Sequence, residues 1–361
     1  MIEPSFVEKW QQTAGAHLKF KIDSLMKSQK CYVLGRNPVS KYITDLFSIQ
    51  GLVDDFSINK FWHCLPVIKA SNLPYNSVVI NCSNSVMPVD AANHIEALEG
   101  VNLLQYSDFY RVYPDKFILP KFVYDTREDF AKNKDKWEYT EKALCDEESI
   151  ISLLDILKYR LTGDYNFMRN YSVRPAQQYF ENFTEFSKDE VFVDAGGFTG
   201  DTTEQFCLRC PDFGKIYFFE PSSRNIEEAK KRLKTTEEIV YSEVGLSDSD
   251  GFLFFNPDKG SASSINLDGT GEKIKVSTLD HIVAEQVSFI KMDLEGWEIK
   301  ALQGAREHIL KDKPKLAISV YHFPSDIWKI FEFVKNINPD YKVYLRHYTQ
   351  GWSETVMYFI P

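Results

Sequence analysis

Residues 191–203 read VFVDAGGFTGDTT, and this stretch decides the fold. Its first residues form a short apolar, β-branched run typical of a buried strand, and glycines and a polar helix start follow directly. A strand, a glycine turn and a helix N-terminus together make the nucleotide-binding corner of an open, doubly wound α/β sheet. The candidates for binding the nucleotide in the turn and the helix start are Gly196, Gly197, Gly200, Asp201 and Thr202.

Asp194, at the end of this strand, indicates which nucleotide the corner would bind. A dinucleotide fold has a glycine there, so that pyrophosphate can approach bare backbone. A carboxylate would repel pyrophosphate at short range, but it would attract a ligand that carries positive charge. S-adenosylmethionine (SAM) carries a sulfonium and an ammonium group and no phosphate, so Asp194 favours SAM over NAD.

A second acidic residue, Glu220, supports a nucleoside site. Residues 215–221 read KIYFFEP, a buried strand that ends in Glu220 about 20 residues beyond the glycine turn. An acid at the end of the second strand can accept both ribose hydroxyls, in NAD as well as in SAM. The alternative is that Glu220 only caps the next helix, where Ser222 and Ser223 are also good capping residues.

The composition limits the class of protein. A length of 361 residues predicts two domains, and 43% hydrophobic residues are enough for two cores. The net charge of −10 disfavours nucleic acid as the main partner, because phosphate binding needs a basic surface. We see neither the apolar core of a signal peptide nor an apolar run of membrane-spanning length, and we expect a cytoplasmic protein without a membrane span.

The six cysteines are scattered along the chain, which suits reduced thiols. Cys207 and Cys210 form a single CxxC pair. Because a zinc site of this type needs a second pair of ligands nearby, packing within a helix is the preferred interpretation.

The N-terminal third predicts a separate, smaller domain. After a helical segment at residues 1–30, strands alternate with helices over residues 31–113, which indicates a Rossmann-like unit with a parallel sheet. Its glycine pattern, Gly35-x-x-x-x-Ser40, is weak support for bound phosphate. Ligand binding and a purely architectural or dimerising role both stay open for this unit.

Residues 114–186 are expected to form a connector and a helical lid region. Prolines, lysines and aromatic residues up to 146 indicate a connector, and apolar residues at helical spacing over 147–161 predict a packed helix. Residues 165–186 either fold over the cofactor as a lid or pack as a plain helix.

Residues 187–361 are expected to form the catalytic domain. A third strand at 238–248 ends in Ser247 and Asp248, where the edge of an adenine would lie. Two further strands, at 252–256 and 273–279, flank the segment GSASS at residues 260–264. The other expected strands of this domain lie at 287–293, 315–323, 341–348 and 354–361, and the last two form an antiparallel hairpin.

Asp293, Glu295 and His322 are the candidate catalytic residues. Asp293 and His322 are expected at the carboxyl ends of neighbouring strands, where open α/β sheets place their chemistry. Methyl transfer to a hydroxyl needs the acceptor oxygen in line with the methyl group and a base for its proton. His322 is our preferred base because its ordinary pKa lies near the working pH, although it could be purely structural. Asp293 is expected to orient SAM or the acceptor, and Glu298 to favour a helix N-terminus through the helix dipole.

Asp293, Glu295 and His322 could instead be metal ligands. Mg²⁺ sites usually need more carboxylates, so we expect no metal. Arg346 and His347, with the GSASS segment, are candidates for acceptor recognition.

The stretch IKMDLEGWEIKALQGA at residues 290–305 is the most specific in the chain. Together with VDAGGFTGDTT, FEP, VGLSD, GSASS and STLD, it resembles the FkbM family of SAM-dependent methyltransferases over about residues 190–361. The family usually has VGAN-like residues where this chain has residues 195–198, and the second glycine would remove a side-chain contact to SAM. The resemblance implies a class I methyltransferase sheet with a late antiparallel hairpin.

Two weaker resemblances suggest the acceptor. The N-terminal unit is similar to the N-terminal domain of bacterial sugar acetyltransferases, which holds nucleotide-linked sugars. The ending SVYH…D…YLRHY resembles a bacterial subgroup linked to surface-glycan methylation. We therefore expect an O-methyltransferase that acts on a sugar hydroxyl of a glycan or a nucleotide-linked sugar and leaves S-adenosylhomocysteine, and it could form a homo-oligomer.

Two other classes of protein stay as alternatives. An NAD-dependent oxidoreductase would need the N-terminal unit to supply the cofactor site, but that unit lacks a full GxGxxG. A non-catalytic protein that binds glycans or nucleotide sugars would retain the SAM fold without turnover.

Overall fold

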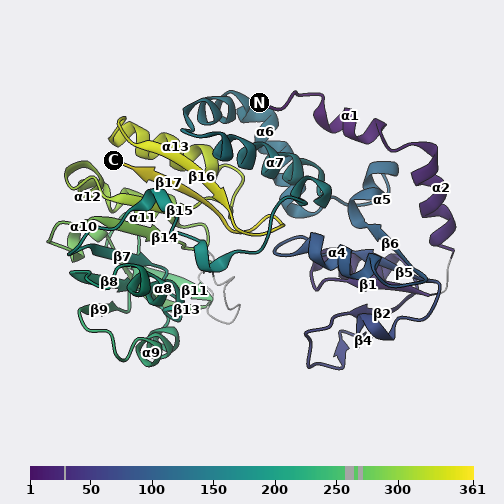
Figure 1. The fold of residues 1–361 in the computed structure, drawn as a ribbon, viewed down its shortest axis with the longest axis horizontal. Coiled ribbons are helices and arrows are strands. Elements are labelled where there is room, and N and C mark those ends of the chain that lie inside the picture. The colour runs from purple at the N-terminus through teal and green to yellow at the C-terminus, as the bar shows by residue number, and fades with distance from the viewer. Residues whose placement is uncertain (28–29, 257–263, 267–270) are drawn as a thin grey trace. The chain divides into compact units, whose positions relative to one another are not determined.

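The computed structural model describes residues 1–27, 30–256, 264–266 and 271–361, and the chain divides into two compact units (Figure 1). The N-terminal unit comprises Met1–Lys134, Ile151–Arg174 and Tyr348–Ser353. The C-terminal unit comprises Asp135–Ile150, Pro175–His347 and Glu354–Pro361. Each unit has its own α/β architecture. Within the described residues, no helix is long and apolar enough to cross a membrane.

The N-terminal unit is built on a six-stranded sheet in the order β3-β4-β2-β1-β5-β6. All neighbouring strands are parallel except the short antiparallel pair of β3 and β4. The strands are β1 (Cys31–Leu34), β2 (Ile49–Val53), β3 (Phe61–Trp62), β4 (Leu65–Ile68), β5 (Ser77–Asn81) and β6 (Val101–Gln105). The chain order runs outward in opposite directions from β1 and β5, so this sheet has a topological switch point between them.

The helices of this unit are α1 (Phe6–Gln12), α2 (Ala16–Leu25), α3 (Pro38–Leu46), η1 (Ala70–Asn72), α4 (Pro88–Glu96), α5 (Tyr106–Val112) and η2 (Tyr165–Met168). Asn37 caps α3, because its side chain accepts hydrogen bonds from two backbone amides of the first turn. Gly35 has φ +100°, and a Cβ there would lie 2.8 Å from the backbone nitrogen of Ser83. The glycine is therefore explained by the close approach of two loops, without any phosphate.

The expected connector is largely helical. Helix α6 spans Lys121–Ala143 and bends at Asn133, whose φ of −127° is not helical, and α7 spans Glu147–Thr162 as the sequence predicted. The boundary between the two units falls within both helices. Residues 165–186 do not form a plain helix, but contain the short turns η2, η3 (Pro175–Gln177) and η4 (Asn182–Thr184).

The C-terminal unit is built on a seven-stranded sheet in the order β16-β17-β15-β14-β7-β8-β9. The strands are β7 (Val191–Ala195), β8 (Lys215–Phe219), β9 (Ile239–Ser242), β14 (Phe289–Met292), β15 (Lys315–Ser319), β16 (Lys342–His347) and β17 (Thr355–Ile360). Strand β17 is antiparallel to both neighbours, and the other pairs are parallel. The predicted doubly wound sheet with a late antiparallel hairpin is confirmed.

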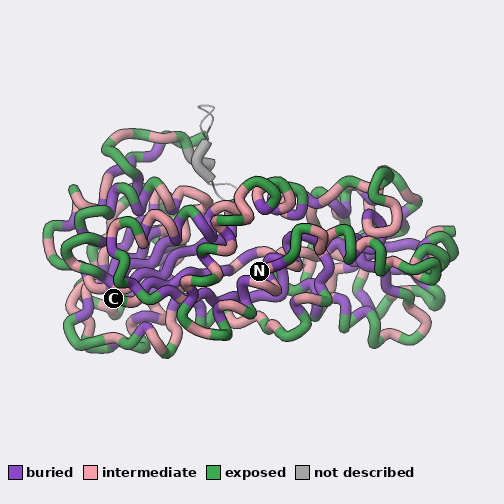
Figure 2. Tube along the Cα trace, turned by 90° about the horizontal axis from the view of Figure 1, so that it is seen from above, coloured by how far each residue is buried: buried purple, intermediate pink, exposed green. Residues whose placement is uncertain are grey.

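The helices of this unit are α8 (Asp201–Arg209), α9 (Ser223–Arg232), α10 (Leu279–Ile282), α11 (Glu298–Gln303), α12 (Arg306–Lys311) and α13 (Asp326–Ile337). Its central strands are buried, as the purple segments of Figure 2 show. Phe192 on β7 stacks on Phe289 of β14 with ring centroids 4.9 Å apart, and both are fully buried. Burying each such ring stabilises the fold by about 1.5–3 kcal/mol.

The prediction for the third strand was wrong in one respect. Strand β9 ends at Ser242, and Ser247 and Asp248 follow a separate strand, β10 (Gly245–Leu246). Strand β10 belongs to a four-stranded sheet in the order β10-β13-β11-β12, with β11 (Gly251–Asn256), β12 (Ser264–Asn266) and β13 (Glu272–Ser277). Most of the GSASS segment, residues 260–263, lies outside the described residues.

Candidate active site

The glycine turn after β7 folds tightly against two neighbouring strands. The backbone amides of Gly196 and Gly197 both donate to the carbonyl of Phe219, at 2.9 and 3.0 Å. Gly196 has φ +77°, and a Cβ there would overlap the carbonyl oxygen of Asp293 at the end of β14. A Cβ on Gly197 would overlap the ring of Phe218. Only glycine lets the turn approach both strand ends this closely.

Asp194 is fully buried and has two protein partners. Its Oδ2 accepts a hydrogen bond from the hydroxyl of Thr203 at 2.7 Å, and its Oδ1 lies 3.0 Å from Nζ of Lys291. The same ammonium donates to the carbonyl of Gly196 at 2.8 Å. Burial alone would lower the pKa of Lys291, but the carboxylates of Asp194 and Asp293 raise it, so the lysine is charged.

This pairing changes the role that we assign to Asp194. We expected its charge to be free to attract SAM, whereas Lys291 balances it. Asp194 instead ties the glycine turn to α8 and β14. A lysine inside the buried strand FIKM was the signal that could have revealed the partner, because a lysine is almost never fully buried unless it is paired.

Gly200, Asp201 and Thr202 lie where α8 begins. Gly200 precedes the helix with φ +81°, and Asp201 and Thr202 form its first turn. The Asp201 side chain is exposed, and its charge is favourable at a helix N-terminus.

Glu220 joins the glycine turn to the start of α9. Its side chain is buried and accepts hydrogen bonds from the backbone amides of Phe198 at 3.1 Å and Ser222 at 2.9 Å. Burial raises the pKa of this carboxyl. Glu220 therefore stabilises the start of α9, as the alternative interpretation expected. It also lies at the strand end where a ribose would bind.

Ser247 and Asp248 are held by the helix that follows Asp293. The indole of Trp297 donates to the Ser247 hydroxyl at 3.2 Å, and Lys300 forms an ion pair with Asp248 at 2.6 Å. Both residues are thus fixed through α11, although they do not end a strand of the main sheet.

The three candidate catalytic residues lie together, as their strands predicted. Nε2 of His322 lies 3.5 Å from Oδ1 of Asp293 and 3.4 Å from Oε2 of Glu295. Its Nδ1 lies 3.1 Å from Oε1 of Glu298, which is fully buried. Strand β15 ends at Ser319, so His322 stands in the loop beyond it and not on the strand. We call Asp293, Glu295, Glu298, Glu354 and His322 the acidic cluster.

The acidic cluster changes the protonation of its members. Burial alone would lower the pKa of His322, but Glu298, Glu295 and Asp293 raise it well above its ordinary value. The imidazole is therefore protonated at neutral pH. Burial also raises the pKa of Glu295, and it raises that of Glu354 to about 7. Among the described residues, neither ring nitrogen of His322 has a partner with hydrogen-bond geometry, although each lies within ion-pair distance of a carboxylate.

Tyr179 is a residue of this site that sequence reasoning did not single out as functional. Its hydroxyl donates to Oδ2 of Asp293 at 2.8 Å, and the amide of Gln178 donates to that hydroxyl at 2.9 Å and to Glu354 at 2.7 Å. The ammonium of Lys291 lies 5.3 Å from the centre of the Tyr179 ring. The segment considered as a lid therefore positions Asp293.

Backbone strain gathers around the same site. Positive φ values are uncommon outside glycine and store strain, often at functional sites. Four of the nine non-glycine residues with positive φ in the described chain lie here: Tyr179 at +72°, Phe198 at +47°, Glu295 at +54° and Glu354 at +65°.

Arg346 and His347 do not have free side chains for an acceptor. Arg346 is buried and forms an ion pair with Asp146 at 2.6 Å. His347 is also buried, with Nδ1 3.0 Å from the hydroxyl of Thr355. These residues hold the terminal hairpin, so the structure does not support their expected role in acceptor recognition.

The cysteines have free thiols, including Cys207 and Cys210. The group of residues that could hold a cation differs from the expected one at a single position, with Glu298 in place of Glu295: Asp293, Glu298 and His322 each offer a ligand atom within 4.8 Å of the others. Glu298 also accepts a hydrogen bond from the backbone amide of Leu294 at 2.7 Å, which commits one of its oxygens to the loop.

Comparisons with known proteins concern the domain and the fold. Residues 194–347 match the model of the methyltransferase FkbM domain. The methyltransferase FkbM of Methylobacillus flagellatus KT is 22% identical and has a TM-score of 0.73, with 99% of this chain and 100% of that chain covered. At this identity the match shows that the two chains share a fold, including the separate N-terminal α/β region.

Two further solved structures are similar to about half of the chain. An rRNA methylase from Streptococcus thermophilus is 17% identical with a TM-score of 0.32, over 48% of this chain and 86% of that one. The precorrin-6y C5,15-methyltransferase of Geobacter metallireducens GS-15 is 14% identical with a TM-score of 0.32, over 49% and 81%. No curated protein matches the sequence. The expected likeness of the N-terminal unit to sugar acetyltransferases stays a prediction. Because residues 194–347 match a methyltransferase FkbM domain, the chain is a methyltransferase whose cofactor is S-adenosyl-L-methionine.

Proposed function

We propose that the C-terminal unit transfers a methyl group from SAM to a hydroxyl of a sugar, in a surface glycan or a nucleotide-linked sugar. The observation that carries the proposal is the position of the His322 imidazole, whose two nitrogens lie 3.1–3.5 Å from three carboxylates. Asp293 belongs to this cluster and also contacts the glycine turn, because its backbone carbonyl lies where a side chain on residue 196 would be. Cofactor and acceptor sites thus share Asp293.

The residues of the turn fit SAM. Gly196 and Gly197 let the turn pack closely against Asp293 and Phe218, and Glu220 offers a buried carboxylate at the strand end for the ribose hydroxyls. Asp194 acts as a positioning residue through Lys291 and Thr203. The other residues that we assign to the cofactor site are Gly200, Asp201, Thr202, Ser247, Asp248 and Asp293. When bound, SAM supplies an electrophilic methyl group.

His322 takes the proton of the acceptor hydroxyl in this proposal. The imidazole must first lose its own proton, because its pKa is raised well above the ordinary value. Once neutral, it accepts the hydroxyl proton as the oxygen attacks the methyl group, and Asp293 and Glu295 stabilise the imidazolium that forms. The same carboxylates that raise the pKa make His322 a stronger base.

The residues beside the acidic cluster support a sugar as the methyl acceptor. Phe323 follows His322 directly and is 50% exposed. Exposed aromatic rings beside a proton acceptor offer apolar faces to the C–H side of a sugar ring. The adjacent carboxylates can accept hydrogen bonds from its other hydroxyls.

The test is to replace His322 by glutamine and to measure SAM binding and methyl transfer separately. We expect unchanged SAM affinity and a rate of transfer to sugar acceptors that falls by about 10²–10⁴-fold. His281→Gln is the matched control, because His281 pairs with Asp250 at 2.6 Å on the exposed surface of the same unit. Transfer at the wild-type rate in His322→Gln would contradict the role of the imidazole. SAM binding without transfer to any hydroxyl would contradict the proposed acceptor.

A further inference from the structure

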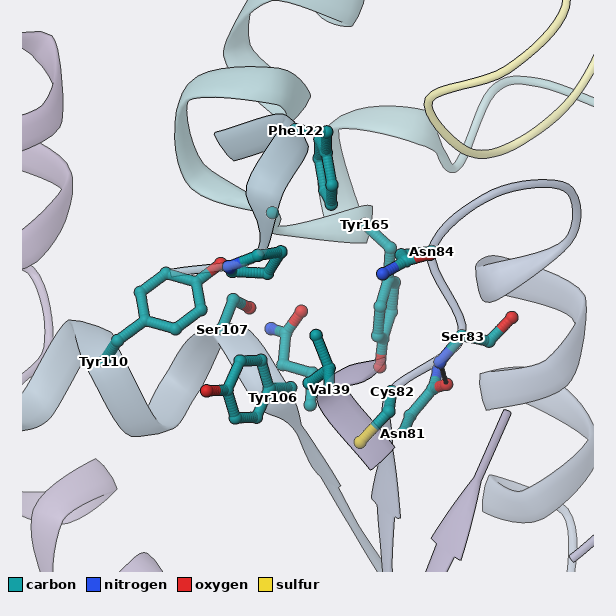
Figure 3. Close-up of a pocket in the computed structure, with 13 residues that line it drawn as sticks. Val39, Asn81, Cys82, Ser83, Asn84, Tyr106, Ser107, Tyr110, Phe122 and Tyr165 are labelled. Atoms are coloured by element: carbon teal, nitrogen blue, oxygen red, sulfur yellow. Dashed lines mark hydrogen bonds between the residues drawn. The ribbon is translucent and has the colours of Figure 1, made fainter. Parts of the chain in front are cut away.

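The cavity of the N-terminal unit that Figure 3 shows is too small for a ligand. It lies beyond the carboxyl ends of β5 and β6, with Asn81 and Ser107 in its lining. Its free space of about 20 Å³ holds a single water molecule. The surface of this unit is therefore the better place for a partner to bind.

A loop at one edge of the N-terminal sheet exposes three large apolar side chains. Residues 54–61, which we call the apolar loop, lead from β2 into the edge strand β3. Phe56, Ile58 and Phe61 in this loop are 88%, 96% and 65% exposed. The Cα atoms of Phe56 and Phe61 are at most about 18 Å apart, because the chain between them extends no further. Several large apolar side chains exposed so close together mark an interaction site.

The apolar loop is held by its own hydrogen bonds. Oδ1 of Asp54 accepts from the backbone amides of Phe56 and Ser57, both at 2.9 Å. The backbone amide of Val67 on β4 donates to the carbonyl of Lys60 at 2.9 Å. The exposed side chains therefore project from a folded loop with a defined backbone.

Five charged side chains in or beside the apolar loop carry a net positive charge. Three are cations and two are carboxylates: Arg36, Lys60, Lys69, Asp54 and Asp55. Asp54 pairs with Arg36 at 2.9 Å, and Nζ of Lys69 donates to the backbone carbonyl of Asp55 at 2.6 Å. Within the described part of the chain, no carboxylate forms an ion pair with Lys60 or Lys69. In a chain with a net charge of −10, this local positive charge is complementary to an anionic surface.

The size of the exposed apolar area favours a lipid surface over a protein. Three side chains of this size bury roughly 150–200 Å² each, or about 500 Å² together. A stable protein interface takes about 800 Å² from each partner, which the apolar loop alone does not supply. Binding at a membrane surface needs less area, because apolar side chains have to enter only the boundary between headgroups and acyl chains.

We propose that the apolar loop docks the N-terminal unit on the surface of a membrane that contains anionic phospholipids. Phe56, Ile58 and Phe61 enter the interfacial layer of the bilayer, and Lys60 and Lys69 face the lipid phosphates. No residue of the apolar loop belongs to the proposed methyl-transfer site, so each proposal can fail without the other.

The experiment measures co-sedimentation of the intact protein with vesicles. One arm uses equal amounts of phosphatidylcholine and phosphatidylglycerol, and the other uses phosphatidylcholine alone. We expect saturable binding to the mixed vesicles, which weakens as salt is added. Phe56→Ser combined with Ile58→Ser should weaken this binding by roughly 100-fold, because each apolar side chain contributes about tenfold. Lys60→Gln should weaken binding to the mixed vesicles by about fivefold, without affecting binding to phosphatidylcholine.

Phe20→Ser combined with Leu208→Ser is the matched control, because these side chains are 72% and 71% exposed outside the apolar loop. The control should bind like the wild type, and neither double variant should change the melting temperature. Sedimentation velocity at increasing protein concentration tests a second copy of the chain as the partner. The proposal is overturned if the wild type does not bind the mixed vesicles, if Phe56→Ser with Ile58→Ser binds as tightly, or if the control loses binding equally. A wild-type dimer that dissociates in Phe56→Ser with Ile58→Ser would also overturn it.

Discussion

Replacing Lys291 by methionine removes the cation that balances Asp194 in the core of the C-terminal unit. The two side chains are 3% and 0% exposed, and Nζ lies 3.0 Å from Oδ1. Breaking a buried ion pair by removing one partner costs about 3–5 kcal/mol, because the remaining charge stays buried without its partner. We therefore expect Lys291→Met to lower the free energy of unfolding of this unit by about 3–5 kcal/mol, and to weaken SAM binding because the glycine turn loses its tie to β14.

The double variant separates the charge from the hydrogen bonds. In Lys291→Met with Asp194→Asn no buried charge remains, and the main loss is the bond from Lys291 to the Gly196 carbonyl. Net losses of about 0.5–1.5 kcal/mol per hydrogen bond predict that the double variant is more stable than Lys291→Met alone. Native-state hydrogen exchange of the β7 and β14 amides measures this locally, which matters because two units need not unfold together.

Lys300→Met is the matched control for this prediction. Lys300 pairs with Asp248 at 2.6 Å in the same unit, but these side chains are 45% and 32% exposed. Water screens such a pair, and we expect a loss below about 1 kcal/mol. Equal losses in Lys291→Met and Lys300→Met, or a double variant less stable than Lys291→Met, would refute the reasoning.

Three further predictions concern the site. The rate of methyl transfer should rise with pH above neutrality, because the raised pKa of His322 keeps the imidazole protonated below it; a wild-type profile retained in His322→Gln would contradict this. Gly196→Ala should lower stability by about 1–3 kcal/mol and abolish measurable SAM binding in calorimetry, whereas Gly251→Ala, with open space around it, should do neither. A metal chelator should leave the rate unchanged; loss of activity restored by Mg²⁺ would instead show that Asp293, Glu298 and His322 bind a cation.

The features that were predictable from the sequence depend on local patterns and on topology. The strand and glycine turn at residues 191–203 are a local pattern, and the structure has β7, the turn and α8 there. Asp293 and His322 follow neighbouring strands, so their convergence followed from the sheet alone. Neither prediction required knowing which side chains pair with one another.

The pairing of Asp194 with Lys291 was not predicted, because the two residues are 97 positions apart and their contact depends on the register of β7 and β14. Helix α6 was missed for a different reason. Most of its residues are polar, and its buried hydrophobic residues, Val123, Phe130 and Trp137, recur only at every second turn. That spacing is helical, but it is sparse enough for the segment to resemble a connector.

The separation of β9 from β10 depends on a turn that periodicity does not show. Residues 239–246 include apolar residues on both sides of this turn, and they read as one strand. In the structure the chain leaves the seven-stranded sheet after Ser242 and enters the smaller sheet at Gly245. Ser247 and Asp248 therefore reach the site through their contacts with α11.

The most direct test of the central claim uses SAM labelled on its methyl group, the purified protein and a panel of glycans and nucleotide-linked sugars. Mass spectrometry of the products locates the label. We predict a labelled methyl ether on a sugar hydroxyl, which is lost in His322→Gln while SAM remains bound. Label on a nitrogen or carbon atom, or on no sugar of the panel while SAM binds, would contradict the account.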